Sequence, residues 1–131
     1  MENKYVITRK GIEEKSEKNA SDVIREISTR EELEEIIERM PFTQTIQAPN
    51  SKIRKEFYQT AMDKYEDLEW VKVIKSVHLR VEEKRYDEFE LKYLEKAKEF
   101  LYGEIAVAFQ IPFESVEAFL NETIEKQLQA F

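Results

Sequence analysis

The chain contains no cysteine, only two glycines and only three prolines among its 131 residues. The lack of cysteine excludes disulfide scaffolds, cysteine-ligated zinc fingers and thiol catalysis. Two isolated glycines, Gly11 and Gly103, are too few for a dinucleotide-binding fingerprint or a P-loop. Because glycine and proline disfavour helix interiors, a chain with few of either and many Glu, Lys and Leu residues is typical of helices.

Long apolar stretches are missing as well. Runs such as Ile105–Phe113 are far shorter than the ~20 apolar residues that span a bilayer. Glu2 and Asn3 follow Met1, and no apolar segment of a secretory signal comes after them. With 41% hydrophobic residues the chain is nevertheless apolar enough to fold. We therefore expect a cytoplasmic protein with no membrane segment.

The charge is acidic and unevenly distributed. The net charge is −7, of which residues 1–65 contribute −1 and residues 66–131 contribute −6. An acidic C-terminal half disfavours broad affinity for DNA, because that affinity depends on neutralising phosphates. A local basic patch remains compatible with this balance.

The N-terminal residues favour strand and loop. Tyr5–Thr8 belongs to a run rich in β-branched and aromatic residues, which predicts a strand. The polar stretch Lys10–Ser21 is interpreted as a loop. Val23–Ile27 alternates in polarity and is either a second strand or an extended entry to a helix.

Five helical segments follow, each marked by apolar residues three or four positions apart. They are expected to begin at the capping box Ser28–Glu31, at Asn50 or Ser51, at Asp67, at the capping box Asp87–Glu90, and at Pro112. The second is predicted to turn Ile53, Phe57, Ala61 and Met62 inward. The predicted fold is mainly α: a compact bundle of about five helices with one or two short N-terminal strands. We expect a strand-containing segment over residues 1–27 and a helical domain over residues 28–131.

Residues for catalysis are scarce. His78 is the only histidine, and metal sites or acid–base pairs need several ligands or partners within reach. The many carboxylates are interpreted as an ion-paired, solvated surface, including Glu82, Glu83, Asp87, Glu88 and Glu90. We therefore predict no catalytic residue, no metal site and no cofactor.

Two small groups of basic residues are the remaining candidates. Lys52, Arg54 and Lys55 open the second helix, and Lys72, Lys75 and Arg80 lie along the third. A basic helix N-terminus with nearby aromatic residues suits phosphate binding. The alternative interpretation is ordinary solvated Lys and Arg beside aromatic residues of the core.

Several motifs resemble one family. The main ones are Tyr86–Glu90 followed by Leu94–Ala97 and Leu101–Ala106; Val73–Lys75 and the stretch from Asn19 to Glu32 add weaker matches. Over roughly residues 19–120 the chain resembles the helical domain of the CarD/CdnL family of bacterial transcription regulators. Asp87 stands where that family has a capping serine.

The resemblance implies a function. In that family a Tudor-like N-terminal β-domain binds RNA polymerase, and the helical domain contacts promoter DNA at the upstream edge of the transcription bubble. Tyr5–Thr8 resembles at most one late strand of that β-domain. By position, Lys52, Arg54, Lys55 and Lys75 correspond to the DNA contacts. The family's wedge tryptophan falls near Asn50–Ile53, where this chain has none, and Trp70 lies in a different helix.

The first hypothesis is therefore a non-catalytic regulator that stabilises RNA polymerase–promoter complexes and binds promoter DNA weakly. The second is an acidic helical module that binds another protein and no nucleic acid. An enzyme comes last. We also expect homodimerisation through the open edge of the Tyr5–Thr8 strand, because an unpaired edge seeks a partner.

Overall fold

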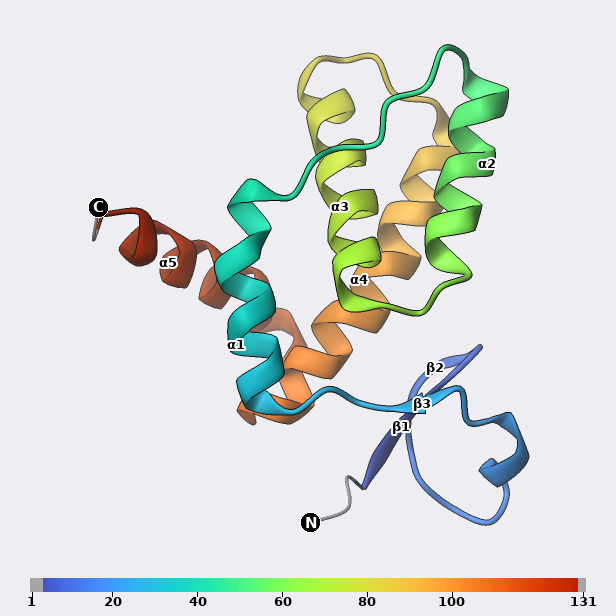
Figure 1. Ribbon diagram of the computed structural model, residues 1–131, viewed down its shortest axis with the longest axis vertical. Coiled ribbons are helices and arrows are strands. Elements are labelled where there is room, and N and C mark those ends of the chain that lie inside the picture. Colours follow the sequence, from blue (N-terminus) through green and yellow to red (C-terminus); the bar gives the residue numbers. More distant parts are fainter. Residues whose placement is uncertain (1–3, 130–131) are drawn as a thin grey trace. The chain divides into compact units, whose positions relative to one another are not determined.

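The computed structural model (Figure 1) describes residues 4–129, which form five α-helices and a three-stranded sheet. The strands are β1 (Tyr5–Thr8), β2 (Gly11–Glu14) and β3 (Arg25–Glu26). The helices are α1 (Arg30–Arg39), α2 (Ser51–Met62), α3 (Asp67–Glu82), α4 (Glu88–Phe109) and α5 (Val116–Gln129). Short 3₁₀ turns lie at Ala20–Asp22, Met40–Phe42 and Phe113–Ser115. The predicted mainly α fold class is confirmed, with a third strand added to the sheet.

The chain folds into two compact units and passes between them twice, within the Met40–Phe42 turn and within α4. The first unit comprises residues 1–41 and 102–131, and the second comprises residues 42–101. The predicted division at residues 27 and 28 concerns a different grouping and stays a prediction.

The sheet of the first unit has the strand order β2-β1-β3, and both pairings are antiparallel. The prediction of a loop from Lys10 to Ser21 is wrong for β2. Gly11 has φ +136°, a conformation that residues with a side chain rarely adopt, and it pairs with Thr8 across a tight turn. The strand escaped detection because Ile12 is its only large apolar residue. β1 is the central strand, so the premise of an unpaired Tyr5–Thr8 strand is wrong.

A buried glutamate fixes the entry to α1 in the first unit. Glu104 is 0% exposed, and its carboxylate accepts from the backbone N–H of Ser28 at 2.6 Å and from Arg25 Nη1 at 2.8 Å. The helix cap therefore begins at the next residue: Thr29 Oγ1 accepts from the N–H of Glu32, whose side chain accepts from the N–H of Thr29. The predicted capping box at Ser28–Glu31 was one residue early.

Gly103 marks a close approach between α4 and the sheet in the first unit. A Cβ at this position would lie 2.8 Å from Cγ1 of Ile12, which is shorter than real Cβ contacts. Glycine thus removes an obstacle to packing at this point, although inside a helix it costs ~1 kcal/mol relative to alanine.

The second unit packs α2, α3 and the first part of α4 around aromatic residues. Trp70 stacks on Phe100 with ring centroids 5.0 Å apart, and both rings are buried. The predicted inward face of α2 was wrong at Phe57, which is 44% exposed, whereas the neighbouring Tyr58 is fully buried. The helix turns Arg54 and Tyr58 inward because their polar ends reach the buried carboxylate of Glu90 on α4.

Candidate nucleic-acid interface

Glu90 lies in the first turn of α4 and binds side chains from α2 and α3. It is 0% exposed, although the sequence predicted a surface position. Tyr58 Oη donates to Glu90 Oε1 at 2.8 Å, and Arg80 Nε donates to the same oxygen at 2.7 Å. Arg54 Nε lies 3.8 Å from it. A buried carboxylate needs such compensation because desolvating an unpaired charge is costly.

Glu90 also closes the N-terminus of α4. Its second oxygen, Oε2, accepts from the backbone N–H of Asp87 at 2.7 Å, which is half of the predicted capping box. Burial raises the pKa of Tyr58 first, and its hydrogen bond to Glu90 and that residue's charge raise it further. Tyr58 therefore keeps its proton and remains a donor to Glu90 throughout the neutral range.

Arg54, one of the four predicted DNA contacts, faces into this cluster. Its side chain is 10% exposed, and Nη1 lies 3.6 Å from Oδ2 of Asp87. Asp87 Oδ2 also accepts from Ser51 Oγ at 2.8 Å. A direct phosphate contact by Arg54 would require these ion pairs to open, so the geometry favours a role in positioning α2.

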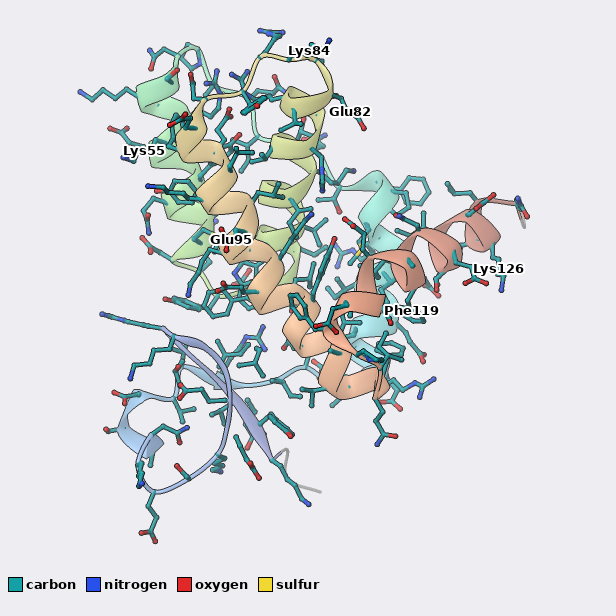
Figure 2. All side chains as sticks on the ribbon, turned by 180° about the vertical axis from the view of Figure 1, so that it is seen from behind. Lys55, Glu82, Lys84, Glu95, Phe119 and Lys126 are labelled. Carbon is teal, nitrogen blue, oxygen red and sulfur yellow. The ribbon has the colours of Figure 1, made fainter. Side chains whose placement is uncertain are left out.

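Lys52 and Lys55 point to solvent in the first two turns of α2. Asn50 caps this helix, with its Oδ1 accepting from the N–H of Ile53 at 2.9 Å. The amino ends of helices bind anions through their backbone dipoles and N–H groups. Two exposed ammonium groups beside such an end form a small cationic surface, and Figure 2 shows Lys55 on the outside of α2.

Lys75, the fourth predicted contact, is half-buried on α3. Its ammonium donates to the carbonyl of Thr43, in the segment that leads to α2. Burial lowers the pKa of Lys75. The structure thus places only Lys52 and Lys55 of the predicted four on an open surface.

Sequence reasoning did not single out three further lysines of this unit. Lys84 is exposed in the turn before α4, with φ +57°, and Figure 2 shows it at the end of the unit. Lys92 and Lys96 share a face of α4 with Phe89 and Tyr93. The sequence shows the helical spacing of these α4 residues, but it does not show that α2 lies opposite them.

The class that these features define is a mainly α protein with a cationic helix end set on a buried ion-pair cluster. A family comparison matches residues 35–121 to the CarD C-terminal domain. The match covers more than half of the chain, and the protein belongs to this family, which is associated with transcription and with RNA polymerase. No curated protein matches the chain.

Two further findings concern residues 4–129. None of their helices is long and apolar enough to cross a membrane. These residues also contain no group of three or more His, Asp or Glu side chains placed to bind a metal ion. His78 is half-buried on α3.

Proposed function

We propose that the protein is a non-catalytic bacterial transcription regulator that stabilises RNA polymerase–promoter complexes in the cytoplasm. The observation that carries the proposal is the family match over residues 35–121, which spans the whole second unit, α2 and α3 included. RNA polymerase is the protein partner, and promoter DNA is a weak second partner.

Lys52 and Lys55 make the proposed DNA contacts. Both are exposed at the amino end of α2, where the helix dipole adds to their charge. Arg54 and Lys75 support them by fixing α2 and the segment before it. Because only two lysines contact DNA and the chain has a net charge of −7, affinity for DNA alone is weak and falls as salt rises.

The experiment measures the lifetime of complexes between bacterial RNA polymerase and a promoter, with and without the protein. The double variant Lys52→Glu/Lys55→Glu is expected to lose most of the stabilisation, because it reverses both exposed charges. The matched control, Lys18→Glu/Lys126→Glu, makes the same charge change at exposed positions of the first unit and is expected to behave as the native chain.

Equal lifetimes for both variants would contradict the proposed contacts. If the native protein binds polymerase but no promoter effect is measured, the second hypothesis, an acidic module for protein binding, takes its place. Homodimerisation stays a prediction with a changed basis. β1 is paired on both sides, so a second copy would have to pair with β2 or β3.

A further inference from the structure

A groove runs between α2 and α4 in the second unit. It has a volume of about 390 Å³, which suits a small ligand, or one base or side chain of a polymer. Its lining comprises Lys55, Gln59, Met62, Asp63, Tyr65, Phe89, Lys92, Tyr93, Lys96 and Phe100. On α4 these residues recur every three or four positions from Phe89 to Phe100, which corresponds to a length of ~16 Å.

The groove is cationic on an acidic protein. Lys55, Lys92 and Lys96 line it, against the single carboxylate of Asp63. The Lys55 ammonium lies 6.0 Å from the ring centroid of Phe89, and that of Lys96 lies 5.1 Å from the centroid of Phe100. Lys96 also pairs with Glu99 at 3.4 Å. Cations beside aromatic rings are the combination with which proteins bind single-stranded nucleic acids.

Polar groups along the groove are hydrogen-bonded to one another in a short chain. Tyr93 Oη donates to Gln59 Oε1 at 2.7 Å, and Gln59 Nε2 donates to Asp63 Oδ1 at 2.8 Å. Burial, and secondarily the charge of Asp63, raises the pKa of Tyr93, so the hydroxyl keeps its proton. A carboxylate has about four acceptor positions, so Asp63 has capacity for a further donor such as the amino group of a base.

We propose that this groove binds a short stretch of single-stranded DNA. Phosphates lie against Lys55, Lys92 and Lys96, and an unstacked base packs against Phe89 and Tyr93 with its amino group toward Asp63. The inference rests on the proposed function, since Lys55 belongs to both the groove and the promoter contact. The inference adds single-stranded DNA from the melted promoter to the forms of DNA that the protein binds. A peptide rich in Glu and Phe fits less well, because its side chains could meet the lysines and the rings but offer no donor to Asp63.

The test measures binding of labelled oligo-dC and oligo-dT single strands by fluorescence anisotropy, without polymerase. Oligo-dC is expected to bind more tightly than oligo-dT, because cytosine has an exocyclic amino group and thymine has none. Asp63→Ala is expected to remove this preference. The salt dependence should have a log–log slope of about −2, from three phosphates at ~0.7 each.

Lys92→Glu/Lys96→Glu is expected to weaken oligo-dC binding by about tenfold or more, since two of the three phosphate contacts are reversed. Lys18→Glu/Lys126→Glu serves as the charge-matched control and should bind as the native chain. Thermal unfolding checks the fold, and Lys92→Gln/Lys96→Gln provides a milder variant without new repulsion against Glu88.

Equal binding by the lysine variants and the control, or no binding by the native chain, would overturn the inference. Binding of a Glu- and Phe-rich peptide instead, lost in the lysine variants, would overturn it and assign the groove to a protein partner. The proposed function is separable from both results. Promoter complexes that are still stabilised through Lys52 and Lys55 would support it, whatever the groove binds.

Discussion

The two units each bury one glutamate of α4, and they surround it differently. Glu90 in the second unit meets two arginines and a tyrosine from α2 and α3. Glu104 in the first unit meets Arg25 and a backbone N–H from the segment before α1. The first arrangement joins three helices through side chains. The second fixes the path of an extended segment, so a similar buried acid serves packing in one unit and chain direction in the other.

Glu90→Gln should show the largest effect. It leaves the arginines at 54 and 80, which are mostly buried, without a carboxylate between them, and breaking a buried ion pair costs about 3–5 kcal/mol. Urea unfolding should report that loss in the free energy of unfolding. Glu88→Gln, at an exposed position two residues earlier, is the control and should change it by less than about 0.5 kcal/mol. A loss below ~1 kcal/mol for Glu90→Gln would contradict the central role of Glu90.

Glu104→Gln should have a smaller effect, of about 1–3 kcal/mol, because hydrogen bonds to a charged group are replaced by weaker ones. Arg25 is 28% exposed in its side chain, so water compensates part of the lost pairing. Hydrogen exchange of the Ser28 amide should accelerate, because its N–H donates to Glu104. Glu99→Gln on the same helix is the exposed control. An unchanged exchange rate at Ser28 would mean that Glu104 does not fix this segment.

The smallest effect concerns Tyr102 and appears only at high pH. Burial, and secondarily the charge of Glu117, raises the pKa of Tyr102 to about 12. The folded state thus retains a proton that the unfolded state releases near pH 10. This contribution to stability is complete below pH ~10 and is lost as pH rises towards ~12. At pH ~11 about 1 kcal/mol of it has been lost.

Unfolding of the native chain and of Tyr102→Phe should be compared at neutral pH and near pH ~11, where about 1 kcal/mol separates their pH dependence. The native chain should lose more stability than the variant over this range, because phenylalanine does not titrate. Identical losses would exclude Tyr102 as a source of alkaline sensitivity. Tyr58→Phe tests the other unit, since the pKa of Tyr58 is raised as well.

The helices were largely predictable from apolar spacing and from local start signals, but the cap expected at Asp67 was wrong. The N-cap of α3 is Glu66, whose side chain makes no capping hydrogen bond. Asn50 was correctly chosen as one of two caps for α2, and Pro112 correctly precedes the last helical segment. The rotation of α2 was not predictable from apolar spacing. Phe57 fits an apolar face better than Arg54 does, and only the carboxylate of Glu90 on another helix makes the inward arginine favourable.

The candidate site was predictable where its residues have a local signal and not where they depend on another helix. Lys52 and Lys55 stand out in the sequence as a basic helix start, and the structure exposes both. Glu90 looked like a surface cap because its partners lie on α2 and α3, and Tyr58 is 32 positions away. Lys92 and Lys96 become candidates only because Gln59 of α2 and its C-cap residue Asp63 form the opposite wall of the groove.

The contact between Gly103 and Ile12 has a consequence for how the sequence can change over time. The missing Cβ at residue 103 leaves space that the side chain of Ile12 fills. A larger residue at 103 is therefore tolerated only with a smaller one at 12, so the two positions should vary together among related chains. Such a pair would link the helical part of the protein to a strand that lies outside the matched residues 35–121.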